Sequence, residues 1–178
     1  MARISIPLPD RDFDVTEVAV PWRLLSRAGH ELVFCTEKGA APQADPLLLS
    51  GVLFGQLGAA KEACALYREL ERTDAFRHPV PWDSVDLARF DGLLLPGGHA
   101  PGMRQYLGST GLQDQIAAFF ATGKPVGAIC HGVLVLARSR DPSTGKSVLD
   151  GSYVSARWPG DAYTFARAFE GLLRRGRD

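Results

Sequence analysis

The stretch Lys124-Pro-Val-Gly-Ala-Ile-Cys130-His131-Gly132-Val-Leu-Val-Leu-Ala137 decides the fold, because it passes from a short apolar strand through one cysteine into a helix with almost no loop between them. Such a turn needs small neighbours, here Ala128 and Gly132. A nucleophile elbow of this kind lifts its central side chain above the carboxyl edge of a sheet, where the next helix's N-terminus favours negative charge. The pattern therefore predicts a reactive, readily ionised Cys130. The alternative is a small buried hydrophobe, the common role of a free cysteine.

The composition indicates one globular domain over residues 1–178. Apolar residues make up 46% of the chain, enough to fill one core, and the length leaves little room for a second independent domain. Lys and Arg together number 20, as do Asp and Glu, without a long basic tract, so we expect neither nucleic acid nor a membrane as partner. We expect no signal peptide or membrane span and hence a cytoplasmic protein.

The cysteine spacing bears on disulfides and metals. The chain has three cysteines, Cys35, Cys64 and Cys130, which are widely spaced and form no CxxC pair. An odd number at such spacing argues against a disulfide framework and against a structural zinc site. We interpret Cys35 and Cys64 as packing residues and expect no metal.

Strands and helices alternate along the chain, which predicts an α/β fold with a mainly parallel sheet covered on both faces. Strands are expected at 3–8, 30–36, 90–96, before the elbow and at 153–156, with 30–36 and 90–96 buried. The first helix should begin near Glu17, because Pro21 is tolerated only in a first turn, and Gly29 should end it. Ser109 or Thr110 can cap a later helix. A last helix should bury Ala162, Phe165, Ala166, Phe169 and Leu172.

An unusually long connection, about 37–89, joins the second and third strands. It contains a helical insertion, predicted from apolar residues at helical spacing between Ala63 and Leu70. Long connections often serve as lids or interfaces. This one carries apolar residues at 47–49, 52–54 and Trp82, which favours a homodimer, with a lid over the chain's own sheet as the alternative.

Three features should meet at one edge of the sheet. Glu17 follows the first strand, Gly97-Gly98 follows the third, and Cys130 follows the elbow strand. In a parallel sheet, ligands bind beyond the carboxyl ends of the strands, so these residues mark a candidate site. The alternatives are an acidic residue that merely suits a helix N-terminus at Glu17 and an ordinary turn at Gly97-Gly98.

Four motifs together resemble the ThiJ/PfpI family of the class I glutamine amidotransferase-like superfamily. They are Asp12-Phe-Asp-Val-Thr-Glu17 followed by Pro21, Leu95-Pro-Gly-Gly-His99-Ala-Pro-Gly102, Ala128-Ile-Cys-His-Gly132 and Ser155-Ala-Arg-Trp-Pro-Gly160. The first motif and the long connection are most similar to the branch that contains glyoxalase III and the chaperone-like stress proteins. The resemblance implies a flavodoxin-like three-layer sandwich, a homodimer and no cofactor.

The resemblance also implies roles for individual residues. Glu17 should lie against the Cys130 thiol as a protonated carboxyl that moves protons. The backbone N–H groups of Gly98 and His131 should form an oxyanion hole. The His131 side chain would be a general base beside the nucleophile, or would merely fill the elbow. Gly97 and His99 would line the pocket, although His99 could equally be a surface residue. His30 and His78 are interpreted as structural, without an acidic partner nearby in sequence.

The sequence departs from the family before the last strand. Residues 141–150 lead almost directly into it, whereas relatives have substantially more chain there, so we hypothesise a missing segment near 140–152. That segment often supplies the acid that orients the active-site histidine. Asp150 and Asp161 are the nearest candidates, and a triad acid cannot be assigned from the sequence.

Three functions remain open. The leading hypothesis is a cysteine-dependent, cofactor-independent enzyme acting on small reactive carbonyls, similar to glyoxalase III, with Cys130, His131 and Glu17 as catalytic residues. The second is a hydrolase of amides or peptides, which the unassigned acid weakens. The third is a non-catalytic redox-sensing or chaperone-like stress protein in which Cys130 is oxidised.

Overall fold

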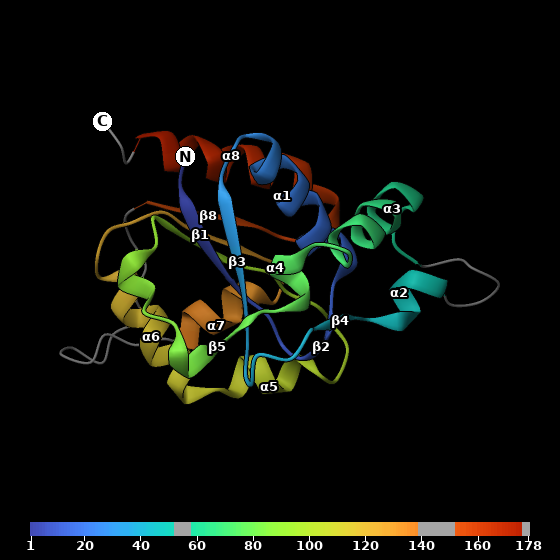
Figure 1. Ribbon diagram of the computed structural model, residues 1–178, viewed down its shortest axis with the longest axis horizontal. Coiled ribbons are helices and arrows are strands. Elements are labelled where there is room, and N and C mark those ends of the chain that lie inside the picture. The colour runs from blue at the N-terminus through green and yellow to red at the C-terminus, as the bar shows by residue number, and fades with distance from the viewer. Residues whose placement is uncertain (52–57, 139–151, 176–178) are drawn as a thin grey trace.

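The computed structural model describes residues 1–51, 58–138 and 152–175 (Figure 1). The main sheet has six parallel strands in the order β5-β3-β1-β6-β7-β8, which confirms the predicted parallel sheet. Its strands are β1 Arg3–Pro7, β3 Glu31–Thr36, β5 Val80–Pro81, β6 Gly92–Leu95, β7 Val126–Ile129 and β8 Tyr153–Ala156. A second, two-stranded sheet pairs β2 Arg11–Phe13 with β4 Gln43–Ala44.

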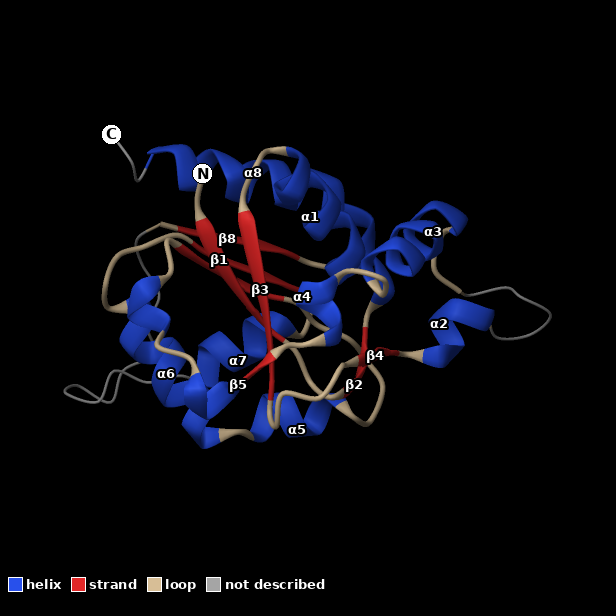
Figure 2. Cartoon of the chain, viewed as in Figure 1, coloured by secondary structure: helices blue, strands red, loops and turns tan. Residues whose placement is uncertain are grey.

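Helices cover both faces of the main sheet, which makes the expected three-layer sandwich (Figure 2). One layer contains α1 and α8, and the opposite layer contains α5, α6 and α7. The central strands β6 and β7 are buried along their whole length, as parallel strands between two helical layers should be. The helices are α1 Val15–Arg27, α2 Pro46–Ser50, α3 Lys61–Leu70, α4 Asp74–Arg77, α5 Met103–Gly108, α6 Thr110–Phe120, α7 Gly132–Arg138 and α8 Ala162–Arg175.

Helix α1 begins two residues earlier than the sequence predicted. Asp14 caps it, because its Oδ1 accepts hydrogen bonds from the backbone N–H groups of Thr16 at 2.7 Å and Glu17 at 3.1 Å. Pro21 therefore lies inside the helix rather than in its first turn, so the prediction that proline fixes the start was wrong. The predicted end is confirmed, since Gly29 follows the helix with a φ of 81°.

Helix α8 packs tightly on the central strands. Its buried face is the predicted one except at the last turn, where Leu173 is buried instead of Leu172. A Cβ on Gly92 would lie 2.6 Å from Leu173 Cδ2, and one on Gly127 would lie 2.9 Å from Phe165 Cζ. Glycine in β6 and β7 thus allows this close approach of helix to sheet.

Much of the described part of the 37–89 connection packs on the rest of the domain. It forms α2, α3 and α4 and the edge strand β5, and α3 confirms the helical segment expected from the sequence. Trp82 is only 3% exposed, and its Nε1 donates to the carbonyl of Cys35 at 3.1 Å. The prediction that Trp82 offers interface surface was therefore wrong. Leu47 and Leu49 are 55% and 37% exposed, and residues 52–54 lie outside the described ranges.

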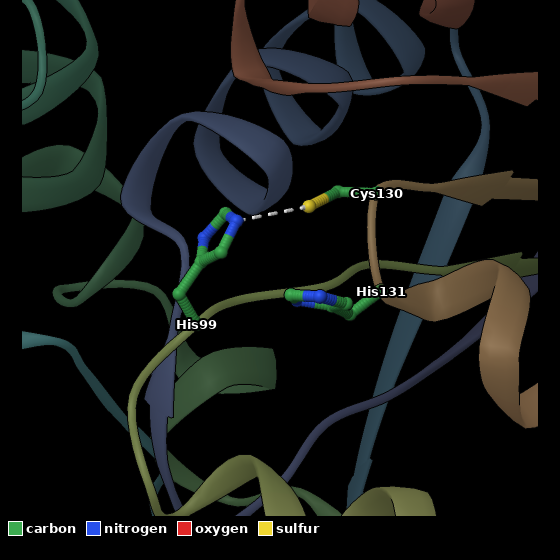
Figure 3. A group of neighbouring side chains, drawn as sticks. All are labelled: His99, Cys130 and His131. Atoms are coloured by element: carbon green, nitrogen blue, oxygen red, sulfur yellow. Dashed lines mark hydrogen bonds between the residues drawn. The ribbon is translucent and has the colours of Figure 1, made fainter.

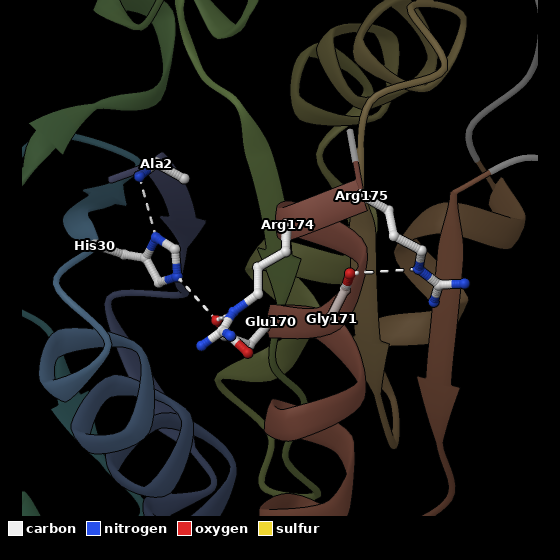
Figure 4. A network of polar contacts seen from close by, with 6 residues as sticks. All are labelled: Ala2, His30, Glu170, Gly171, Arg174 and Arg175. Atoms are coloured by element: carbon white, nitrogen blue, oxygen red, sulfur yellow. Dashed lines mark hydrogen bonds and ion pairs between the residues drawn. The ribbon is translucent and has the colours of Figure 1, made fainter. Parts of the chain in front are cut away.

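Two histidines have acidic partners in the folded chain. His30 Nδ1 accepts from the backbone N–H of Ala2 at 3.0 Å, and its Nε2 lies 3.8 Å from Glu170 Oε1 on α8 (Figure 4). This contact joins the start of β1 to the last helix. His78 pairs with Asp74 at 2.9 Å, so the statement that no acidic residue lies nearby in sequence was wrong for His78.

Two further expectations from the sequence concern a missing segment and membrane-spanning helices. Asp150 and all but the last residue of the hypothesised missing segment near 140–152 lie outside the described residues. Within the described ranges, no helix combines the length and the hydropathy that crossing a bilayer requires.

Candidate active site

The predicted elbow is present between β7 and α7. Cys130 has a φ of 53°, a left-handed conformation that costs energy in a residue other than glycine and is often found at active sites. A Cβ on Gly132 would lie 2.0 Å from the carbonyl oxygen of Leu95, so no larger residue fits there without moving the backbone. The turn therefore presents the Cys130 side chain at the carboxyl edge of the sheet.

The glycine turn after β6 closes against this elbow. A Cβ on Gly97 would lie 2.6 Å from the backbone nitrogen of His131 and 2.9 Å from Glu17 Oε2. A Cβ on Gly98 would lie 2.7 Å from the carbonyl oxygen of Asp12. The two glycines thus let three segments distant in sequence meet within van der Waals contact.

Glu17 is fully buried at the start of α1 and faces the elbow. Its Oε2 accepts from the backbone N–H of Gly97 at 2.8 Å, and the carboxyl also interacts with the Cys130 thiol. Among the described residues, Oε1 has no hydrogen-bond partner. Burial first, and the negative charge of Asp14 second, raise the pKa of Glu17 to about 8. At neutral pH the carboxyl is mostly protonated, in agreement with the expectation from the sequence.

The expectation of a readily ionised Cys130 was wrong. Burial first, and second the negative charge that Glu17 carries above its own pKa, raise the pKa of the Cys130 thiol to about 12, and the hydrogen bond from the backbone N–H of His131 only partly opposes them. The position at a helix N-terminus does not outweigh burial beside two acidic side chains. A base must therefore take the thiol proton as the sulfur reacts.

Two imidazole rings lie at the thiol (Figure 3). His99 Nε2 is 3.7 Å from Cys130 Sγ, and the rings of His99 and His131 meet edge to face with centroids 4.6 Å apart. The sequence predicted either a pocket-lining or a surface position for His99, and in the structure its ring reaches the sulfur. His131 Nδ1 donates to the carbonyl oxygen of Gly98 at 2.6 Å, so in the neutral ring Nε2 is the unprotonated nitrogen.

Within the described part of the chain, no acidic side chain accepts a hydrogen bond from His131 Nδ1 to complete a catalytic triad. Asp161 accepts instead from the backbone N–H and the Nε of Arg157, at 3.4 and 3.2 Å, and Asp150 lies outside the described residues. The position beside Nδ1 of His131 is occupied by the carbonyl of Gly98. The ring is thus oriented by a neutral acceptor.

Asp14 is a site residue that the sequence reasoning missed. It is 3% exposed, and burial raises its pKa while the charge of His99 opposes that rise, so Asp14 and His99 attract one another. Asp14 lies in the first motif, two residues after Asp12 and three before Glu17. Asp14 both caps α1 and places a negative charge near the thiol-facing imidazole.

A family model described as ThiJ/PfpI family-like matches residues 8–155. The chain belongs to the ThiJ/PfpI family. That match includes Glu17, the Gly97-Gly98 turn and the elbow.

Curated relatives include members of this family with assigned names. The chain is 28% identical to the deglycase PfpI of Pyrococcus furiosus over 94% of its own length and 97% of that protein. It is 31% identical to an uncharacterised protein of Schizosaccharomyces pombe over 76% of its own length, and it spans half the length of that protein.

Solved structures share the fold. Glyoxalase III from Candida albicans superposes with a TM-score of 0.73 at 16% identity, covering 96% of this chain and 97% of that one. The Rapid Encystment Protein of Francisella tularensis superposes with a TM-score of 0.76 at 14% identity, covering 97% and 99%. At these identities the likeness concerns the fold alone, and it confirms the flavodoxin-like architecture.

A small cavity lies beside the two imidazoles of this ThiJ/PfpI protein. Its volume is about 230 Å³, which suits a small metabolite. Besides Gly98, His99 and His131, it is lined mainly by apolar side chains and by the cationic Arg104; the remaining lining residues are Ala100, Pro101, Met103, Leu107 and Leu134.

Replacing Glu17 by glutamine is expected to remove a pH dependence of stability. The pKa of Glu17 is about 8 in the folded protein, above the ordinary value of 4.5. The contribution of its protonated carboxyl to the free energy of unfolding is therefore complete below pH 4.5 and is lost as the pH rises to 8. Between pH 4.5 and 9 the wild type should lose on the order of 4 kcal/mol of unfolding free energy that Glu17→Gln retains. Urea unfolding at both pH values measures this. The exposed Asp83→Asn serves as control, and equal slopes in wild type and Glu17→Gln would contradict the assignment.

Proposed function

We propose that this protein is a cysteine-dependent, cofactor-independent enzyme that converts small 2-oxoaldehydes such as methylglyoxal to hydroxy acids. The observation that carries the proposal is the grouping of a protonated, buried carboxyl and two imidazoles around one elbow thiol. Glyoxalase III is the name of one structural neighbour, and deglycase is the name of several curated relatives. The cavity is lined by His99 and His131 but not by Cys130 itself, and its volume agrees with a substrate of a few atoms.

The first step is addition of the thiol to the aldehyde carbon. The Cys130 sulfur forms a bond to that carbon while its proton passes through His99 to the aldehyde oxygen, which gives a hemithioacetal. His99 is suited to this step because its Nε2 faces the sulfur at 3.7 Å and because the raised thiol pKa makes a base necessary.

The second step exchanges the oxidation states of the two carbons. His131 Nε2 takes the proton from the former aldehyde carbon and returns it to the former ketone carbon. Glu17 gives its proton to the ketone oxygen and receives one back from the hemithioacetal hydroxyl. The backbone N–H groups of Gly98 and His131 would stabilise the intermediate enediolate. Water then cleaves the resulting thioester, releasing the hydroxy acid and regenerating the thiol.

Lactate formation tests the proposal. Purified protein is incubated with methylglyoxal in buffer without glutathione and with a chelator, and lactate is measured enzymatically. Accumulation of lactate in proportion to enzyme supports the function. Release of free amine from a peptide substrate, faster than any aldehyde turnover, would favour the hydrolase instead. The neutral acceptor at His131 Nδ1 counts against that alternative, because a hydrolytic triad uses a carboxylate there.

The redox-sensing alternative makes a different prediction, because thiolate character sets the rate of oxidation. The raised pKa of Cys130 disfavours a peroxide sensor. Peptide mass spectrometry after graded peroxide would reveal one by sulfinic acid at Cys130 before any other cysteine reacts.

Replacing His99 by alanine is expected to lower kcat/KM for methylglyoxal by about 10²-fold, because general-base assistance at the sulfur is lost. His78→Ala, which changes an exposed histidine paired with Asp74, is the matched control and should leave turnover unchanged. Steady-state kinetics of both variants measures the difference. Equal activity of His99→Ala and wild type would show that His99 only lines the cavity.

We also propose that the protein is a homodimer. The exposed Leu47 and Leu49 on α2 support an interface on the 37–89 connection, since large apolar side chains are costly to leave in water. Light scattering during size exclusion should give twice the 19.2 kDa chain mass. Leu47→Glu should shift the mass toward that of one chain. A single-chain mass for the wild type at high micromolar concentration would exclude the dimer.

A further inference from the structure

The thiol and the two imidazoles have the arrangement of metal ligands (Figure 3). One donor atom from each of His99, Cys130 and His131 lies within 4.8 Å of the other two. The His99 Nε2 to Cys130 Sγ distance is 3.7 Å. Zinc bonds of about 2.0 Å to nitrogen and 2.3 Å to sulfur, at a tetrahedral angle, require about 3.5 Å between those donors. A single cation can therefore bridge this pair with almost no movement.

The surroundings of both rings agree with ligation. A histidine that binds a metal usually donates its other N–H to a carbonyl or a carboxylate, which fixes the tautomer. His131 Nδ1 donates to the carbonyl of Gly98 at 2.6 Å, so its Nε2 is available as a ligand. The carboxylate of Asp14 attracts His99 and favours a cation at this side of the site.

We propose that His99, Cys130 and His131 form a binding site for a divalent cation of the zinc class, with the fourth position open. Two imidazoles and one thiolate suit Zn²⁺, whereas Mg²⁺ and Ca²⁺ prefer oxygen ligands. Three protein ligands and one open position are typical of accessible zinc sites. No metal was expected from the sequence, because His99 is 31 residues from Cys130 and no ligand spacing joins them.

Occupancy blocks the thiol as a nucleophile. On binding, the S–H proton leaves to solvent and a sulfur–metal bond forms in its place, so the same sulfur electron pair cannot attack a carbonyl. The cation is thus a reversible inhibitor of any chemistry at Cys130. The binding itself does not depend on what that chemistry is.

Titration with Co²⁺ tests the site, because Co²⁺ replaces Zn²⁺ and is coloured. We expect one Co²⁺ per chain, a near-ultraviolet sulfur-to-cobalt charge-transfer band, intense visible bands typical of tetrahedral coordination, and loss of all of them when Zn²⁺ is added. Cys130→Ser should lose the charge-transfer band. His99→Ala should raise the Kd for Zn²⁺ by at least about 100-fold, since it removes a direct ligand.

Two control variants test whether the metal binds to a histidine or a thiol outside the proposed site. His78→Ala removes an exposed histidine, and Cys64→Ser removes the partly buried thiol on α3; both should bind Co²⁺ like the wild type. Thermal melting confirms that each variant is folded. A charge-transfer band that survives in Cys130→Ser, or a Zn²⁺ affinity unchanged in His99→Ala, overturns the proposal.

The failure of this site and that of the proposed function are distinguishable. Metal binding is measured without substrate, and lactate formation is measured with a chelator. Cobalt binding without lactate formation would support the metal site and refute only the proposed enzymatic function. Turnover that 1:1 Zn²⁺ does not inhibit, together with an absent cobalt spectrum, would refute only the site.

Discussion

Replacing Cys130 by alanine is expected to lower the turnover of methylglyoxal by at least about 10³-fold, because every bond change in the proposed reaction passes through its sulfur. The two imidazoles and Glu17 would remain, but an alanine methyl group cannot form the hemithioacetal. The measurement is lactate formation per enzyme at saturating substrate. Circular dichroism and thermal melting establish that the variant is folded.

Cys64→Ala is the matched control for this variant. Cys64 lies on α3, and its thiol is partly buried, as is that of Cys130. Its replacement should leave turnover within about twofold of wild type. If the Cys130 variant retained wild-type turnover, the reaction would have to occur elsewhere and the elbow would have only a structural role.

Replacing Gly132 by alanine is expected to destabilise the protein by more than about 4 kcal/mol, or to prevent folding. The added Cβ would lie 2.0 Å from the carbonyl oxygen of Leu95 and 2.8 Å from its carbonyl carbon. Backbone atoms of a central strand cannot move aside as a flexible side chain can. The elbow or β6 must therefore shift, and this shift would also displace Cys130.

Gly111→Ala is the control for that substitution. Gly111 lies in α6, and a Cβ there would meet no atom within 4 Å, so alanine should be neutral or stabilise by up to about 1 kcal/mol. Urea unfolding and soluble yield compare the two variants. Equal stability of Gly132→Ala and Gly111→Ala would contradict the packing of the elbow against Leu95.

The parts of the site that the sequence predicted are those fixed by local geometry. A strand that runs directly into a helix allows few conformations, so the elbow at Cys130 was visible in a short stretch of sequence. The glycines at 97 and 98 were visible for the same reason, because a tight turn at a strand end needs them. Glu17 was placed correctly because carboxyl ends of parallel strands share one edge.

The parts that the sequence missed depend on contacts between distant segments. His99 reaches the sulfur because the glycine turn packs against the elbow, and Asp14 acts at a distance through charge. The pKa of Cys130 was mispredicted because a helix N-terminus is visible in sequence, whereas burial beside Glu17 is a tertiary property. Trp82 was wrongly predicted to lie at an interface, because its indole donates a hydrogen bond to a buried carbonyl on β3.

The most direct measurement of the central claim is peptide mass mapping of protein quenched in acid during turnover of methylglyoxal. We predict that the peptide containing Cys130 gains the mass of one methylglyoxal, as hemithioacetal or thioester, while Cys35 and Cys64 stay unmodified. The adduct should disappear as substrate is consumed. An unmodified Cys130 during continuing lactate formation would contradict covalent catalysis at the elbow.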